Sequence, residues 1–209
     1  MTNILLLPQF DGTKTAVAIA QNSDWLDAIL FTAPGSPAAP IAVSGASITS
    51  GSATVSNLAA ATVLQLIPGQ PTIGYGIPIG AVIGTVASST SITLASSAGG
   101  TPVNATATDP EANLTINPLP LDLTGITFTC EARKTVADPQ AWITATTPTT
   151  MLNGGTSGQL SFNVPKASLV SVQPGPYVMD IVASGDGHTV NLFQKTGPAS
   201  LTVTQGVTR

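Results

Sequence analysis

Charge is the scarcest property of this 209-residue chain, in which Asp, Glu, Lys and Arg together make up only 8% of the residues. An average soluble domain contains roughly 25%. The six Lys and Arg residues form no basic run and the formal net charge is −4, which argues against nucleic acid as a partner. Hydrophobic residues still make up 43% of the chain, so it also lacks the combination of low hydrophobicity and high net charge that produces disorder.

Cysteine and histidine are almost absent. The single cysteine, Cys130, excludes an intrachain disulfide framework, which fits folding in a reducing cytosol. One cysteine and one histidine, His188, cannot supply the three or four ligands of a zinc site. We therefore expect no metal and no cofactor.

Long apolar runs are missing as well. No stretch approaches the roughly 20 apolar residues that a membrane-spanning helix needs. The first ten residues, MTNILLLPQF, lack a basic start and a signal-length apolar run, and no amphipathic basic stretch indicates a membrane surface. We expect neither secretion nor a membrane partner.

The composition that remains is typical of an all-β protein. Thr, Val and Ile favour strands, and 20 Gly and 17 Pro interrupt them. A surface with so little charge is poorly suited to an abundant free monomer, so we expect much of it to be covered in an assembly. The alternative is a Ser- and Thr-rich surface that is soluble enough by itself.

The last third of the chain has the clearest strand pattern. Ile126, Phe128, Cys130 and Ala132 alternate with polar residues, as in a sheet with one solvated face. Tyr177, Met179 and Ile181 form a second alternating strand, and SGDGHT supplies a short hairpin turn. Further strands are predicted at 141–146, 159–164, 190–193 and 201–204, with a loop at 147–158 and either one helical turn or an irregular crossing at 166–172.

Two predicted strands near the start, residues 15–20 and 25–31, complete eight strands, which favours a two-sheet, immunoglobulin-like sandwich. We assign residues 1–41 and 118–209 to this sandwich. APGSPAAP, residues 33–40, is interpreted as a linker because its prolines cannot run through a central strand.

Residues 42–117 are predicted to form a small inserted β-module, because aromatic and charged residues become rare there. Its strands are expected at 53–56, 61–67, 81–87, 91–95, 103–108 and 112–116, with a chain of turns at 68–80. Its apolar residues are small and few, so we expect it to need support from neighbouring copies or from the rest of the chain.

No arrangement of residues indicates an enzyme. Asp186 and Asp180 lie near His188 in sequence, but a hairpin turn explains Asp186-Gly187-His188 without catalysis. Cys130 is expected to be an inert buried thiol, and Trp25 and Trp142 to pack in the core rather than stack on sugars. Asp109-Pro110-Glu111 is expected to be a solvated turn rather than a calcium site.

The candidate contact residues lie in loops, because loops on a rigid sandwich carry recognition. They are Tyr75, in a turn-rich segment, and Asn153, Gly154 and Gly155, near the tip of the loop at 147–158.

Several segments resemble a recurring domain of tailed bacteriophages. NSDWLDAILFT, PLDLTGITFTCEAR, PGPYVMDIVASGDGHTVNLFQKTGPASLTV and the terminal VTR are similar, in this order, to small tail and baseplate proteins, including the immunoglobulin-like N-terminal region of baseplate upper proteins. GYGIPIGAVIGTVASSTSITLASSA resembles a pattern of tail-fibre and capsid-associated proteins. In the resembling baseplate domains the second strand runs directly into the LTG strand, whereas about 75 residues intervene here.

The resemblance implies a non-enzymatic structural component of a virion, in the tail or baseplate, that packs against other virion proteins and copies of itself. Symmetric particles lead us to expect a homo-oligomer. One alternative is a capsid decoration or head-fibre protein. An alternative of another class is a glycan- or receptor-binding module that uses Trp or Tyr stacking.

Overall fold

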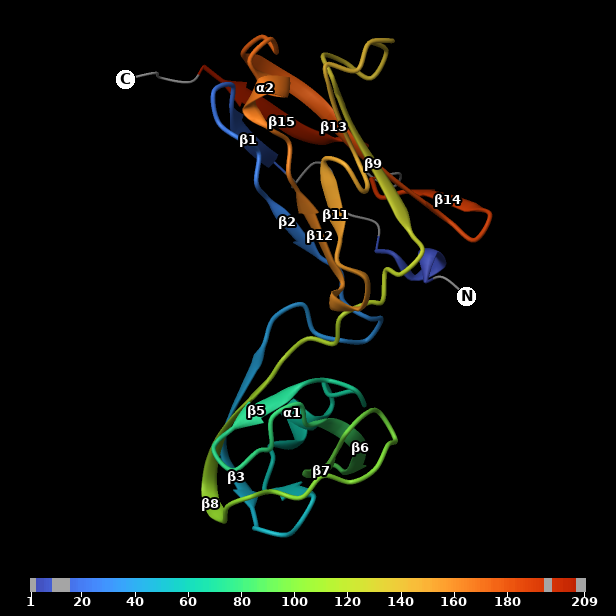
Figure 1. Ribbon diagram of the computed structural model, residues 1–209. Coiled ribbons are helices and arrows are strands. Elements are labelled where there is room, and N and C mark those ends of the chain that lie inside the picture. The colour runs from blue at the N-terminus through green and yellow to red at the C-terminus, as the bar shows by residue number, and fades with distance from the viewer. Residues whose placement is uncertain (1–2, 9–15, 194–196, 206–209) are drawn as a thin grey trace. The chain divides into compact units, whose positions relative to one another are not determined.

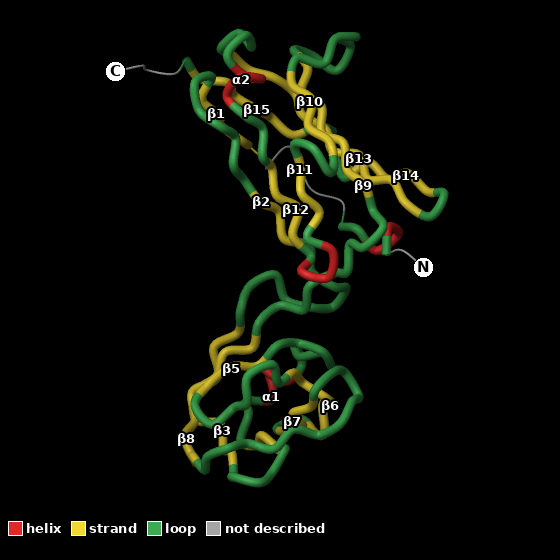
Figure 2. Tube along the Cα trace, viewed as in Figure 1, coloured by secondary structure: helices red, strands yellow, loops and turns green. Residues whose placement is uncertain are grey.

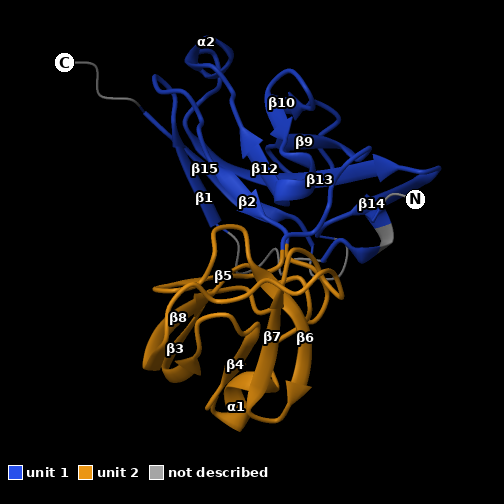
Figure 3. Cartoon of the chain, turned by 60° about the horizontal axis from the view of Figure 1, so that its bottom comes forward, with its two compact units in different colours: residues 1–31, 120–209 blue, residues 32–119 orange. Residues whose placement is uncertain are grey.

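The computed structural model describes residues 3–8, 16–193 and 197–205 of the chain. The fold is all-β, with 45% strand and 7% helix, as the composition predicted. Figure 2 shows strands and loops throughout, with only short helical segments. The chain forms two compact units, residues 1–31 with 120–209 and residues 32–119, coloured separately in Figure 3.

Unit 1 is a sandwich of two sheets. The larger has the strand order β1-β15-β13-β9-β10, with β14 paired to the end of β13, and the smaller has the order β11-β12-β2 (Figure 1). All pairings are antiparallel except that of β1 with β15. The strands are β1 Ala16–Ala20, β2 Ala28–Leu30, β9 Thr127–Arg133, β10 Ile143–Thr146, β11 Met151–Asn153, β12 Gln159–Phe162, β13 Gly175–Gly185, β14 His188–Asn191 and β15 Ala199–Thr204.

Three short helical segments accompany these strands: η1 Ile4–Leu6, η2 Gly155–Ser157 and α2 Lys166–Leu169. The segment at 166–172 thus takes the helical-turn form, one of the two that its sequence allowed.

The strand order is that of an immunoglobulin-like sandwich. In that nomenclature β2, β11 and β12 correspond to strands B, D and E, and β9, β10, β13 and β15 to strands C, C′, F and G. The hydroxyl of Tyr177, near the start of β13, donates a 2.7 Å hydrogen bond to the carbonyl of Gln173. This is the tyrosine corner that ties the E–F connection to strand F in such domains.

The core of unit 1 lies between the two sheets. Phe128, Cys130 and Ala132 of β9 face inward and are buried, and so are Tyr177 and Met179 of β13. Both predicted alternations are therefore confirmed. Phe31 and Phe128 stack at 5.8 Å between ring centroids, and Trp25 stacks on Phe162 at 4.3 Å.

Unit 2 is inserted between β2 and β9. The chain leaves the sandwich at Phe31 and returns at Leu121, whose N–H donates a 2.9 Å hydrogen bond to the Phe31 carbonyl. The unit begins at residue 32 rather than 42, because the proline-rich segment is not a free linker. Ala33 N–H donates to the Leu119 carbonyl, and Leu119 N–H donates to Ser36 Oγ. The segment is thereby attached to the returning chain.

Unit 2 is one curled sheet in the order β5-β8-β3-β4-β7-β6. A bridge between Pro71 and Val82 joins its two ends. Its core is aliphatic and includes Ile48, Ile83, Ile92 and Ile116. The elements are β3 Ile41–Ile48, β4 Thr54–Ser56, α1 Ala60–Val63, β5 Thr72–Gly74, β6 Val82–Ser88, β7 Ser91–Ala95 and β8 Asp109–Ile116.

Two strands predicted in unit 2 are wrong. Residues 61–67 form part of α1 and a following turn, with Val63 and Leu66 buried and Leu64 exposed, a spacing of three rather than two. Residues 103–108 form no ladder, because their N–H groups donate in different directions: Ala105 to Ser52 and Thr106 to Gly76.

Five further segments differ from the prediction. Residues 72–74 form β5 within the predicted chain of turns, and 151–153 form β11 within the predicted loop at 147–158. No strand was predicted at Ile41–Ile48, which forms β3 directly after the predicted linker. Asp109-Pro110-Glu111, expected to be a solvated turn, begins strand β8. Leu192 and Phe193 lie in a turn beyond β14. The start of the predicted strand at residue 15 and the terminal VTR lie outside the described residues.

Candidate functional site

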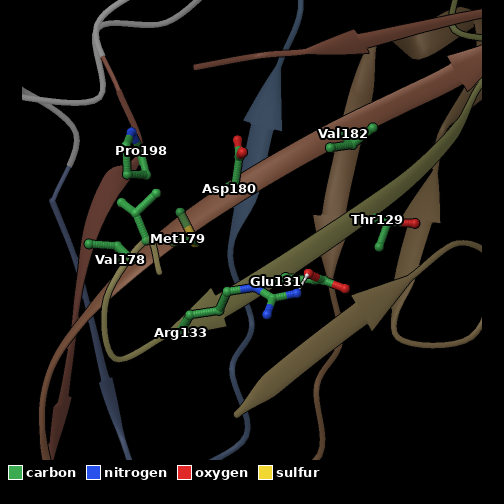
Figure 4. Close-up of a pocket in the computed structure, with 9 residues that line it drawn as sticks. Thr129, Glu131, Arg133, Val178, Met179, Asp180, Val182 and Pro198 are labelled. Carbon is green, nitrogen blue, oxygen red and sulfur yellow. Dashed lines mark hydrogen bonds and ion pairs between the residues drawn. The ribbon is translucent and has the colours of Figure 1, made fainter. Parts of the chain in front are cut away.

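The outward side of strands β9 and β13 forms a shallow pocket of about 460 Å³, which we call the outer-face pocket (Figure 4). Alternation in the two strands produces it, since every second side chain turns away from the core. The lining residues are Thr129, Glu131, Arg133, Val136, Val178, Met179, Asp180, Val182 and Pro198. The pocket is thus an apolar hollow that contains three charged groups.

Two carboxylates lie directly opposite each other in this pocket, because the register of β13 and β9 pairs Asp180 with Glu131. Like charges in this position destabilise a sheet. Arg133 neutralises Glu131 through a 2.6 Å ion pair, and its second nitrogen donates to the carbonyl of Asp138 at 2.8 Å.

Asp180 is paired with no cation among the described residues. Its oxygens accept the N–H of Ile181 at 2.9 Å and the side-chain amide of Asn191. Burial raises the pKa of this carboxyl above its ordinary value, and the nearby charge of Glu131 raises it further, while the two hydrogen bonds act in the opposite direction. The ionised form of Asp180 is therefore costly in the isolated chain, and a cation placed beside it would relieve that cost.

A cluster of rings and charges is formed around Lys134 and Asp138, and the Asp138 carbonyl contacts the pocket residue Arg133. The Lys134 ammonium lies 4.2 Å from the centroid of the Tyr177 ring and 6.0 Å from that of Trp142. Trp142 donates its indole N–H to Asp138 at 3.1 Å. The pKa of Asp138 is lowered, chiefly by the N–H of Gln140 and then by this indole. Lys134 is thus bound to rings, and Asp138 to N–H donors.

This concentration of charge is unusual for the chain. Ten acidic and six basic residues are spread over 209 positions. Three of them line the outer-face pocket, Glu131, Arg133 and Asp180, and two more, Lys134 and Asp138, belong to the neighbouring cluster.

Tyr177→Phe tests how much the tyrosine corner stabilises unit 1. We expect the free energy of unfolding of unit 1 to fall by about 1 kcal/mol, because one hydrogen bond to the Gln173 carbonyl is lost. Both tryptophans of the chain, Trp25 and Trp142, belong to unit 1, so tryptophan fluorescence during urea unfolding reports this unit alone.

Tyr75→Phe is the matched control, because the Tyr75 side chain is 72% exposed and belongs to unit 2. We expect it to leave the fluorescence transition unchanged. Equal transitions for Tyr177→Phe and the native chain would show that the corner hydrogen bond contributes nothing.

The residues predicted from sequence as contacts are not brought together in one unit. Tyr75 lies in unit 2, beyond the end of β5. Asn153 lies in unit 1, where its amide donates to the carbonyls of Leu123 and Ile126 at 2.8 and 2.6 Å. Its side-chain oxygen accepts the N–H of Gly155 at 2.9 Å, and Gly154 leads into η2. Asn153 therefore holds its own loop and the 123–126 turn together.

The chemical groups considered from sequence occupy structural positions. Cys130 is buried, as predicted, and burial is the chief cause that raises its pKa. Trp25 is buried as predicted, whereas Trp142 is half-buried at the edge of the core. His188 pairs with Gly185 in the β13–β14 hairpin. Within residues 3–8, 16–193 and 197–205, no three His, Cys, Asp or Glu side chains are grouped to hold a metal ion.

The outer-face pocket is not predicted by the sequence. The prediction that the polar sides of both strands face outward is correct, but the sequence places Asp180 only near His188. The opposition of Asp180 and Glu131 depends on strand register, and no single strand shows its register.

The fold is an immunoglobulin-like sandwich with an inserted β-unit and a pocket on the outward face of its larger sheet. Comparison of the chain with protein-family models, curated proteins and solved structures returned no match. Among the described helices, none has the length and apolarity required to cross a membrane.

Proposed function

We propose that this chain is a non-enzymatic structural component of a tailed-bacteriophage virion, located in the tail or baseplate. It acts by packing against copies of itself and other virion proteins in a symmetric particle. The observation that carries the proposal is the outer-face pocket, an apolar hollow in which the Asp180 carboxylate is paired with no described cation, in a chain that is otherwise poor in charge.

The phage-like segments supply the strands that build this face. PLDLTGITFTCEAR contains β9, and PGPYVMDIVASGDGHTVNLFQKTGPASLTV contains β13 and most of β15, three neighbouring strands of the larger sheet. NSDWLDAILFT contains β2 of the facing sheet. The resemblance therefore covers strands that are adjacent in space as well as ordered in sequence.

Unit 2 adds a second apolar surface. Ile73, Tyr75 and Ile79 are all exposed within nine residues of β5 and the following turn. Exposed apolar residues gathered in one segment indicate a surface that a partner covers. This supports an assembly role for unit 2 as well.

The test is to separate phage particles from the source on a density gradient and quantify this chain by mass spectrometry against the major capsid protein. We expect it to migrate with intact particles at a few copies to some tens of copies each, as a tail component would. Hundreds of copies would instead place it on the head as a decoration or head-fibre protein. Absence from intact particles would overturn the virion proposal.

A further inference from the structure

Among the described residues no cation is paired with Asp180 in the outer-face pocket, and the chain has an ammonium at another surface that could pair with it in a second copy. Three basic residues lie in the described part of the chain: Arg133, Lys134 and Lys166. Arg133 pairs with Glu131, and Lys134 lies over the Tyr177 ring. The ammonium of Lys166 has no ion pair, hydrogen bond or ring contact with any described residue.

Lys166 lies on α2 beside exposed apolar surface. It begins α2, and its N–H donates to Asp24 at 2.7 Å, which anchors the start of the helix. The N–H of Val170 donates to the Lys166 carbonyl at 2.9 Å, so the two side chains lie one helical turn apart on the same face. Val170 is 61% exposed. α2 thus presents a free ammonium beside an exposed valine.

This face of α2 and the outer-face pocket complement each other. The pocket offers Asp180, a carboxylate paired with no described cation, among apolar side chains such as Val178 and Val182. A lysine can lay its methylene stem on such side chains and place its ammonium against the carboxylate. The exposed valine adds apolar surface to be covered.

We propose that two copies of this chain associate head to tail, with Lys166 and Val170 of one copy seated in the outer-face pocket of the next, the ammonium against Asp180. This inference rests on the proposed assembly function and names the partner as a second copy. The hollow around Lys166 and Val170 shares no lining residue with the outer-face pocket. The contact is therefore heterologous, and repeating it generates a ring or a helical filament rather than a closed two-fold dimer.

Charge exchange tests the contact directly. Lys166→Glu places a carboxylate opposite Asp180, and Asp180→Lys places an ammonium opposite Lys166, so each variant alone repels its own copies. We expect both to dissociate at least about tenfold more readily than the native chain. Sedimentation velocity over a concentration series measures this, and native association should also weaken at high salt.

Mixing the two variants in equal amounts should restore association. The carboxylate introduced by Lys166→Glu then meets the ammonium introduced by Asp180→Lys, and the native Lys166 of the second variant meets the native Asp180 of the first. Circular dichroism and thermal melting confirm that each variant is folded. Asp180→Asn, which removes the charge with little change in shape, is expected to weaken association as well and serves if Asp180→Lys does not fold.

Glu111→Lys is the control, because it makes the same kind of charge reversal at an exposed residue of unit 2. It should associate like the native chain. A native chain that stays monomeric, folded variants that associate normally, or a mixture that fails to associate would overturn the head-to-tail contact. None of these outcomes affects the particle fractionation, where a chain bound only to other virion proteins still migrates with the particle.

Discussion

Replacing Gly158 with alanine is expected to destabilise unit 1 by about 2 to 4 kcal/mol, because the new methyl group meets backbone that cannot move aside. An added Cβ would lie 2.5 Å from the Phe31 carbonyl oxygen and 3.0 Å from both N and O of Leu121. Gly158 also has a φ of +66°, which residues with a Cβ rarely adopt. Three chain segments meet here, where the chain leaves for unit 2 and returns from it.

Gly187→Ala separates the two contributions. Gly187 has a similar φ of +76°, but nothing lies within 4 Å of an added Cβ. It should therefore show only the backbone strain, about 1 kcal/mol. Urea unfolding followed by tryptophan fluorescence measures the stability of both variants. An equal loss of stability in the two would contradict the clash of the added methyl group with Phe31 and Leu121.

Phe128→Ala is expected to lower the free energy of unfolding of unit 1 by about 3 to 5 kcal/mol. Phe128 is 1% exposed and stacks on Phe31 across the two sheets. Truncation removes buried apolar surface and leaves a cavity that the sheets can fill only in part. The same fluorescence measurement applies, with the transition midpoint shifted to lower urea.

Thr129→Ala is the control for this variant, since Thr129 is the next residue of β9 and faces outward. We expect a change within about 0.5 kcal/mol. If Thr129→Ala were as damaging as Phe128→Ala, the assignment of the two faces of β9 would be wrong. The pair thus tests the alternation on which the outer-face pocket depends.

The head-to-tail contact would give the scarcity of charge a role. Few charged groups lie on the surface, so few other charge pairs can form between copies. The half-buried Asp180 carboxylate and the Lys166 ammonium, which has no partner among the described residues, can therefore set how two copies align. The neutral remainder, including Tyr75 and its neighbours in unit 2, is then available for contacts that need no charge.

Much of the fold follows from local sequence pattern. The alternations in β9 and β13 predicted their buried faces, and the hairpin turn Asp186-Gly187 lies between β13 and β14. Two errors lie in unit 2. The strand Ile41–Ile48, which directly follows the proline-rich segment, was not predicted, and residues 61–67 were predicted as a strand although their buried side chains, Val63 and Leu66, lie three residues apart, as in a helical turn.

The sequence by itself determined that this protein is all-β, that its sandwich is interrupted by an insertion, and which side of each long strand is buried, because side-chain alternation and turn residues are local properties. Only the tertiary structure decided that Asp180 faces Glu131, that Arg133 pairs with Glu131, and that the Lys166 ammonium has no partner among the described residues. These facts depend on register and on contacts between segments far apart in the chain. No local pattern encodes them, because pairing β13 with β9 one residue out of register would place different side chains opposite each other.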